Sequence, residues 1–182
     1  MTAPILTHQA ILQLLDYCPV SGVFTWRARP RNHFKNIQAY GAWNTRYAGK
    51  EAGGISGQGY SKISIYGYLY SAHRLAWLHV YGEFPSEEID HINHDRSDNK
   101  LSNLREATHS QNGRNAKKRR DNTSGTTGVS WCKRENRWIA SIKVDGKLKY
   151  GGYFINKDAA IARRKEMNAE HGYHKNHGNS IA

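Results

Sequence analysis

The densest group of side chains able to bind metals or transfer protons lies in residues 88–115. Four of them have the types needed to activate water beside a phosphodiester: Asp90, His91, Asn103 and Asn112. The first two end a short apolar strand, the third precedes a second strand, and the fourth lies one turn into a predicted helix. Two strands and a helix can bring four such side chains to one point. Their order therefore favours a hydrolytic site.

The residue types indicate the chemistry of this site. His91 is the candidate general base, because an imidazole with an unperturbed pKa of about 6.5 is largely neutral at physiological pH. Asp90 and Asn112 carry hard oxygen ligands, which favour Mg²⁺, Mn²⁺ or Ca²⁺ over zinc. Asn103 can accept a hydrogen bond from the imidazole and orient the ring. A divalent cation stabilises the charge that builds up when a phosphodiester is cleaved.

Two other interpretations of these residues are open. An Asp-His pair by itself is more often an aspartate that orients a structural histidine. His91 and His94 could also begin a zinc site, and the histidines available to complete it are His73 and His109. No ligand spacing supports that site, and the two cysteines cannot form a four-cysteine one. No zinc is therefore expected.

Residues 60–116 resemble the HNH family of endonucleases, which have a ββα-metal active site, and most closely the phage and intron-encoded homing subgroup. The resemblance rests on the Asp-His pair, the two asparagines and the preceding segment His-Arg-Leu-Ala-Trp at 73–77. It implies a role for each residue: Asp90 as metal ligand, His91 as general base, Asn103 as the residue that positions the base, and Asn112 as second metal ligand. His73 and Arg105 are candidate phosphate contacts. The paired zinc-binding cysteines of many members are missing here.

The charge of the chain indicates a polyanionic partner. The 182 residues include 27 Lys and Arg against 15 Asp and Glu, a net charge of +12. Residues 1–115 contribute +3 and residues 116–182 contribute +9. The 5 Trp and 11 Tyr are too many for a disordered basic tail, so the chain should fold. No apolar run approaches the roughly 18 residues of a membrane span, so an intracellular protein is expected, in the host cytoplasm if a phage encodes it.

The composition predicts two domains. The expected boundaries are an HNH domain with an N-terminal extension over 1–116, a basic linker over 117–123 and a second domain over 124–182. The linker is inferred from the Lys and Arg run at 117–120, which passes into turn-forming residues. The alternative for this run is an ordinary solvated surface.

In the first domain, apolar spacing predicts a helix over 8–16 and a strand over 23–27. A hairpin with strands over 60–66 and 68–72 follows, and then a second helix over 73–81. Residues 28–59 show no clear period and are expected to form loops with one candidate strand. In the second domain, three strands are predicted over 129–135, 137–144 and 147–154. Asn156 then caps a helix that runs to about residue 170.

The middle strand of the second domain has two different faces. One face of this strand is apolar and consists of Trp138, Ala140, Ile142 and Val144. It should pack on the helix, where the small residues Ala159, Ala160 and Ala162 permit close approach. The opposite side, called the open face below, consists of the alternate residues: Arg137, Ile139, Ser141 and Lys143. A sheet with basic and aromatic side chains on one free side can enter a major groove of DNA.

Residues 124–172 resemble the DNA-binding domain of plant ethylene-response factors, which also occurs fused to HNH nucleases in phages. The matching residues are Gly128-Val129, Trp138 with Ala140 and Ile142, Gly152 to Phe154 and the Ala-rich helix. The resemblance implies DNA contacts from five residues: Trp131, Arg134, Ser141, Lys143 and Tyr150. Two basic residues of the same sheet, Arg137 and Lys147, are further candidate contacts. Ser130 replaces the arginine that usually follows Gly-Val, so the plant target sequence does not carry over.

The sequence therefore predicts an α+β protein with an N-terminal ββα-metal HNH domain and a C-terminal three-stranded antiparallel sheet packed on one helix. We expect site-specific hydrolysis of double-stranded DNA with Mg²⁺ or Mn²⁺, as in homing endonucleases. A single active-site set favours a monomer that nicks one strand, with a dimer as the alternative. A DNA-binding regulator with a silent nuclease site is the rival function. RNA binding is disfavoured, because the major groove of A-form RNA does not admit a sheet.

Overall fold

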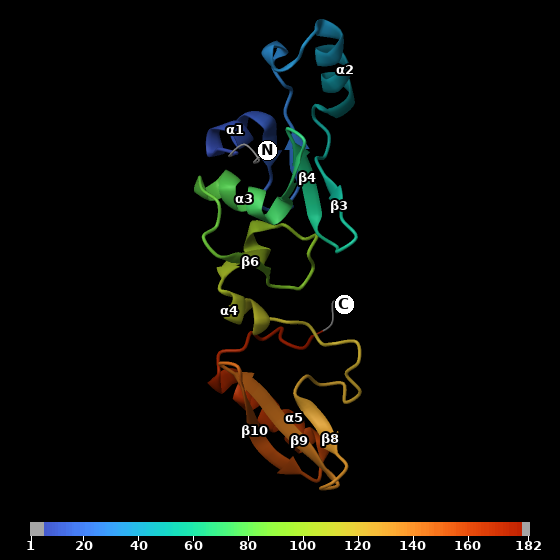
Figure 1. Ribbon diagram of the computed structural model, residues 1–182, viewed down its shortest axis with the longest axis vertical. Coiled ribbons are helices and arrows are strands. Elements are labelled where there is room, and N and C mark those ends of the chain that lie inside the picture. Colours follow the sequence, from blue (N-terminus) through green and yellow to red (C-terminus); the bar gives the residue numbers. More distant parts are fainter. Residues whose placement is uncertain (1–5, 180–182) are drawn as a thin grey trace. The chain divides into compact units, whose positions relative to one another are not determined.

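The computed structural model describes residues 6–179 and contains both helices and strands, which confirms the α+β class (Figure 1). The chain divides into two compact units, Met1–Glu106 and Ala107–Ala182. The segment after residue 107 groups with the second unit because the carbonyls of Arg114 and Ala116 accept hydrogen bonds from His174 N and Gly178 N at 3.2 and 2.9 Å. Along residues 6–179, no helix has the length and apolar character needed to cross a bilayer.

The first unit opens with a helix that is shorter than predicted. α1 (His8–Leu14) begins at Thr7, whose hydroxyl accepts a hydrogen bond from the Ala10 N–H at 3.2 Å. It ends at Leu14 because the next residues form β1 (Leu15–Tyr17), which pairs antiparallel with β2 (Phe24–Trp26). Strand pairing with a neighbour thus ends a helix that the local apolar pattern would have continued.

A helix that the sequence pattern does not predict follows β2 and the short turn η1 (Arg31–His33). α2 (Ile37–Tyr47) is capped by Asn36, whose side chain accepts from the Ala39 N–H at 2.8 Å. None of its residues is buried, so it lacks the apolar stripe by which amphipathic helices are detected. The expectation of loops is therefore wrong for this helix, whereas the one candidate strand expected within 28–59 is present as β3 (Gly54–Ile55).

A three-stranded antiparallel sheet and a helix complete the core of the first unit. The sheet has the order β3 (Gly54–Ile55), β4 (Ser61–Ile65) and β5 (Tyr68–Ser71). The predicted hairpin of β4 and β5 is present, with Tyr66 and Gly67 at positive φ in its turn. α3 (Ala72–Tyr81) follows and ends at Gly82, whose φ of 87° stops the helix as predicted.

The strand that carries the Asp-His pair belongs to a small separate sheet. β6 (Glu88–His91) pairs with β7 (Leu104–Ala107), and η2 (Leu101–Asn103) lies just before β7. Ile89 of β6 and Leu104 of β7 are buried in the same core as α1 and α3. Strands β6 and β7 are thereby anchored in the hydrophobic core of the first unit.

The second unit contains the predicted sheet on one helix. β8 (Val129–Cys132), β9 (Arg137–Val144) and β10 (Lys147–Phe154) form an antiparallel sheet with β9 in the centre. α5 (Lys157–Glu170) is capped by Asn156, whose side chain accepts from the Asp158 N–H at 2.7 Å. This unit also includes α4 (His109–Gly113) at its start.

Close packing of α5 on the sheet depends on a glycine as much as on alanine. Ala160 is fully buried, but Ala159 and Ala162 are exposed, so only one of the three predicted alanines faces the sheet. On β10, a Cβ added at Gly151 would lie 2.5 Å from the sulfur of Met167 and 3.0 Å from Cγ of Arg163, so these α5 side chains would have to shift. Gly151 also forms the bulge at which the register of β10 shifts.

Candidate active site

Asp90 lies at the end of β6 and is held by Arg105 of β7. Asp90 is 5% exposed, and its Oδ2 accepts hydrogen bonds from Arg105 Nε at 2.9 Å and Nη2 at 2.7 Å. Pairing of β6 with β7 brings the two side chains together. The sequence predicts Arg105 as a candidate phosphate contact; the structure shows that its guanidinium neutralises the carboxylate of the predicted metal ligand.

His91 is buried next to Asp90, and an amide oxygen lies at its ring. His91 Nε2 is 3.4 Å from Asn99 Oδ1. Because Asn99 Nδ2 donates to the Ser97 carbonyl at 2.9 Å, its oxygen is the atom turned to the ring. A neutral imidazole that donates from Nε2 to this oxygen has its lone pair on Nδ1. Burial lowers the pKa of His91, opposed by the Asn99 hydrogen bond and nearby carboxylates, which suits a neutral proton acceptor.

Asn99 is itself fixed by the β1–β2 hairpin. Its carbonyl accepts a hydrogen bond from the Tyr17 hydroxyl at 2.7 Å, and burial raises the pKa of that hydroxyl to about 12, so it stays a donor. Gly22, in the hairpin loop, has a φ of +75°, and a Cβ there would lie 2.4 Å from Lys100 N and 2.5 Å from the Asn99 carbonyl carbon. The hairpin thus packs directly against the backbone that carries Asn99.

Asn103 is buried and closes the loop between His91 and β7. Its Oδ1 accepts from the Asn93 N–H at 3.0 Å, and its Nδ2 donates to the Asp98 carbonyl at 2.8 Å. The sequence predicts a hydrogen bond from the imidazole to Asn103. In the structure the amide seen at the His91 ring belongs to Asn99, and Asn103 acts on the loop backbone.

His73 of α3 packs against the catalytic candidate as an uncharged ring. The centroids of His73 and His91 are 5.0 Å apart with the rings nearly perpendicular, and the Tyr60 ring contacts both of them, at 5.4 Å from His73 and 6.0 Å from His91. Burial first, and then the electrostatic influence of His91, Arg74 and Lys62, lower the pKa of His73 to about 3, so it is neutral at physiological pH. The predicted phosphate contact from His73 would therefore lack a positive charge.

Asn112 is placed on α4 by a reciprocal cap. The Thr108 hydroxyl accepts from the Gln111 N–H at 3.2 Å, and the Gln111 side chain accepts from the Thr108 N–H at 2.8 Å. This capping box fixes the start of α4, and Asn112 lies one turn further along the helix. α4 belongs to the second compact unit, so the role of Asn112 as second metal ligand rests on the resemblance to HNH endonucleases.

The donor set fits a sparsely coordinated hard cation. Among residues 6–179 there is no cluster of three or more His, Cys, Asp or Glu able to hold a metal. Mg²⁺ needs no such cluster, because it keeps several waters and is usually bound by one or two carboxylates together with substrate phosphates. The single carboxylate at Asp90 matches that pattern, and Asn112, which lies in the second unit, is added to it only by the resemblance to HNH endonucleases.

The register of the second sheet decides which predicted DNA contacts share a face. Directly paired residues of antiparallel strands point to the same side. Tyr150 pairs with Ser141, and Leu148 pairs with Lys143, so these β10 residues join Arg137 on the open face. Tyr150 is 66% exposed and Leu148 55%. The open face therefore combines cations with exposed apolar and aromatic surface.

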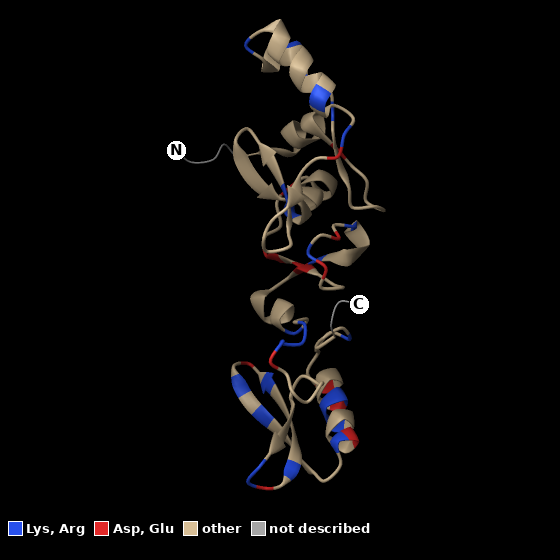
Figure 2. Ribbon diagram, turned by 90° about the vertical axis from the view of Figure 1, so that its right-hand side faces the viewer, with Lys and Arg blue, Asp and Glu red and all other residues tan. Residues whose placement is uncertain are grey.

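Two predicted contacts lie on the other side of this sheet. Trp131 pairs with Trp138, and Lys147 pairs with Val144, so both point to the side on which α5 packs. The Trp131 and Trp138 rings make an edge contact at 5.3 Å. Arg134 lies in the turn between β8 and β9 and is ion-paired with Glu135 at 2.8 Å. Figure 2 shows Lys and Arg along the β8–β10 sheet, whereas α5 carries charges of both signs.

Asn99 and Tyr17 are not among the site residues that the sequence predicts. Asn99 lies in the Asp-Arg-Ser-Asp-Asn-Lys stretch, where an asparagine is typical of any turn, and Tyr17 comes from a strand more than eighty residues away. The only sequence signal was the density of Asp and Asn after His91.

A buried Asp-His pair at the end of one strand, a second strand and then a short capped helix is the element order that a ββα-metal nuclease requires. Residues 70–114 match the HNH endonuclease family. Protein 3.8 of Escherichia phage T7 is 36% identical over 76 residues, which cover 41% of this chain and 63% of the phage protein. No solved structure matches the chain at a significant level.

Proposed function

We propose that this chain is a metal-dependent DNA endonuclease that hydrolyses phosphodiester bonds at a specific site. The observation that carries this proposal is the buried Asp90-His91 pair within the segment that matches HNH endonucleases. The net charge of +12 supports DNA as the substrate.

In the proposed reaction, His91 Nδ1 accepts a proton from a water molecule, and the resulting hydroxide attacks the phosphorus. Asn99 holds the ring in the tautomer that leaves Nδ1 able to accept, and Asn103 holds the loop that carries Asn99. Asp90 and Asn112 would bind Mg²⁺ or Mn²⁺, which supplies stabilisation of the developing negative charge. The 3′ oxygen leaves, so the products carry 5′-phosphate and 3′-hydroxyl ends.

Site choice is proposed to come from the second domain, with the open face of β9 and β10 in the major groove. Support comes from the +9 charge of residues 116–182 and from the exposed Tyr150 among cations of that face. Action as a homing-type enzyme, the monomeric state and cleavage of one strand are further parts of the proposal.

A regulator with a silent nuclease site is the second candidate. The Arg105–Asp90 ion pair favours it, because the carboxylate proposed as metal ligand already has a cationic partner. The two candidate functions differ in whether the protein cleaves DNA.

The decisive experiment is relaxation of supercoiled plasmid with Mg²⁺ or Mn²⁺ and with EDTA. We expect cleavage only with the cation, and a rate lower by about 10²- to 10⁴-fold in His91→Ala, the range for loss of a general base. His33→Ala, an exposed histidine of η1, is the matched control and should cut normally. Equal rates for the two variants would reject His91 as the base, and a wild-type protein that cuts under no condition would support the regulator.

A further inference from the structure

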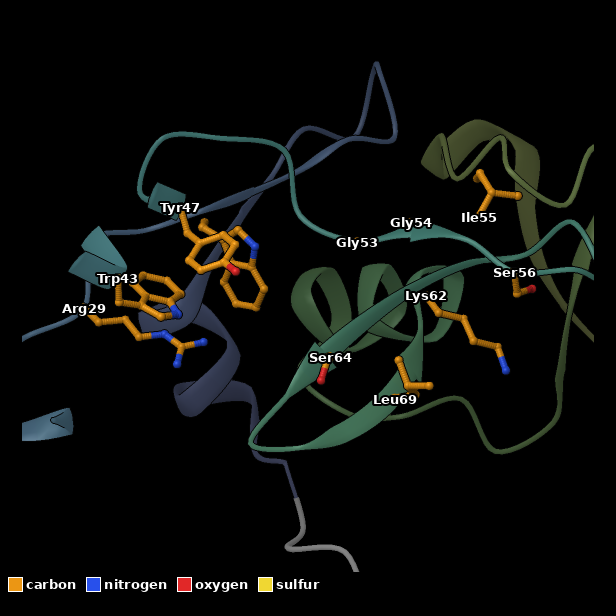
Figure 3. A pocket seen from close by; sticks show the side chains of 11 residues that line it. Arg29, Trp43, Tyr47, Gly53, Gly54, Ile55, Ser56, Lys62, Ser64 and Leu69 are labelled. Atoms are coloured by element: carbon orange, nitrogen blue, oxygen red, sulfur yellow. The ribbon is translucent and has the colours of Figure 1, made fainter. Parts of the chain in front are cut away.

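An open groove in the first unit is lined by aromatic and basic side chains that the proposed cleavage does not use. Its volume is about 630 Å³, within the roughly 300–1,000 Å³ typical of small-molecule sites. Figure 3 shows Trp43, Tyr47 and Arg29 at one end and Lys62 of β4 further along the groove. Neither Asp90 nor His91 lines it.

The aromatic end of the groove is a prearranged wall. Trp26 is buried in the core and contacts Trp43 edge-on, with centroids 5.6 Å apart. Tyr47, one turn further along α2, lies 5.3 Å from Trp43 and is 36% exposed. Because Trp26 anchors this wall, its outer rings offer flat apolar surface at little cost in side-chain entropy. Flat aromatic surface of this kind is where nucleic acid bases stack.

Arg29 adds a guanidinium that stacks on the aromatic wall. Its guanidinium carbon lies 4.1 Å from the Trp43 centroid and 5.0 Å from that of Trp26. Asn44 clamps its backbone by accepting from the Arg29 N–H at 2.9 Å and donating to its carbonyl at 3.0 Å. Within the described part of the chain, Arg29 Nε is buried and has no hydrogen-bond partner. The guanidinium is therefore held in place against the wall, and its terminal N–H groups are the ones suited to bind a phosphate oxygen.

The lining as a whole is positively charged. It contains Arg29 and Lys62. Among the described residues, no Asp or Glu lines the groove. Leu69 and Ile55 add exposed apolar surface on the sheet side. A ligand that matches both features has a flat ring joined to an anionic group.

We propose that this groove binds one unstacked nucleotide of the DNA substrate, with its base against Trp43 and Tyr47, its phosphate at Arg29 and the adjoining DNA backbone at Lys62. The choice of a nucleotide as occupant rests on the proposed nuclease function. The site would grip DNA away from the cleavage centre and select distorted or single-stranded DNA.

Photo-crosslinking of the full-length protein tests the position of the base. The probe is a twelve-nucleotide thymidine strand that carries one 5-iododeoxyuridine, used in EDTA so that no cleavage occurs. Iodouridine crosslinks to the aromatic ring on which it stacks, and peptide mapping identifies that ring. We expect the crosslink at Trp43 or Tyr47. Crosslinks confined to aromatic residues of the second unit, such as Tyr150, would overturn the proposal.

Fluorescence anisotropy with the same strand gives an independent readout. Tyr47→Ala should weaken binding about fivefold or more, the lower limit for loss of one stacking partner, whereas Tyr81→Ala, an exposed tyrosine of α3 outside the groove, should not. Lys62→Gln should reduce the salt slope by roughly 0.7, and Lys50→Gln, which does not line the groove, should leave it unchanged. Equal affinities for the two tyrosine variants would contradict the proposal. A crosslink at Trp43 with no plasmid cleavage would reject only the nuclease function.

Discussion

The guanidinium of Arg105 donates two hydrogen bonds to a single oxygen of Asp90, at 2.9 and 2.7 Å. The Asp90 side chain is 6% exposed and that of Arg105 is 34% exposed. An ionised carboxylate at that depth is costly without a partner, and the Arg105 guanidinium is such a partner for Asp90. A cation that binds Asp90 must share the carboxylate with this arginine.

We predict that Asp90→Asn and Arg105→Ala affect different properties. Asp90→Asn should abolish cleavage and change the free energy of unfolding little, because the amide oxygen still accepts from Arg105. Arg105→Ala should lower that free energy by about 1–3 kcal/mol, since a buried charge loses its hydrogen bonds. Urea denaturation and plasmid relaxation measure the two effects. If Arg105→Ala were as stable as wild type, the ion pair would not support the fold.

Asn99→Ala should slow cleavage without weakening DNA binding. The variant removes the amide that orients the His91 ring, so we expect a loss of about tenfold to a hundredfold in rate, less than removal of the base itself. Single-turnover rates and anisotropy on the same duplex separate the two quantities. Asn32→Ala, an exposed asparagine of η1, is the control. Unchanged cleavage by Asn99→Ala would show that the ring is positioned by other contacts.

Gly22→Ala should lower stability and cleavage together. Gly22 and Gly49 have nearly equal φ angles of +75° and +74°, but only at Gly22 would a Cβ meet backbone, at Lys100 and Asn99. Gly49→Ala should therefore cost only the conformational penalty of roughly 1–2 kcal/mol. The extra loss in Gly22→Ala, by thermal denaturation and by cleavage rate, reports the close packing of the β1–β2 hairpin on the Asn99 loop. Identical behaviour of the two variants would argue against that packing.

Lys143→Gln and Lys147→Gln should differ in their effect on DNA binding. Both remove one positive charge from the same sheet, but Lys143 lies on the open face and Lys147 on the side of α5. If the open face contacts DNA, Lys143→Gln should reduce the slope of log K against log salt by about 0.9, and Lys147→Gln by much less. The reverse order would assign the DNA to the other side of the sheet.

We also predict that nicked circles accumulate before linear DNA. The chain contains one Asp-His-Asn-Asn set, and each strand of a duplex needs a correctly oriented active site. Denaturing gels with the two strands labelled separately measure this order of cleavage. Cuts at matched rates on both strands, together with a dimer mass in solution, would replace the monomer by a twofold-symmetric dimer.

Several elements could be predicted from local sequence because their determinants are local. The α5 helix follows from an asparagine cap and its own residues, and the β9–β10 turn from Asp145-Gly146, whose φ angles are 49° and 79°. Alternation along β9 predicted the packed and open faces. The position of the Asp-His pair at the end of a strand could be predicted from residue types and their order alone.

Tertiary structure decided the features that depend on residues distant in sequence. The sequence by itself determined that Asp90 and His91 end a strand, but pairing of β6 with β7 assigned Arg105 to Asp90, and the β1–β2 hairpin assigned Asn99 to His91. α2 forms without a buried face of its own, and its Trp43 packs on Trp26 of another element. Strand register placed Trp131 and Lys147 away from the open face. The physical reason is common to all of these: hydrogen bonds and ring contacts between separate elements leave no periodic trace in either segment alone.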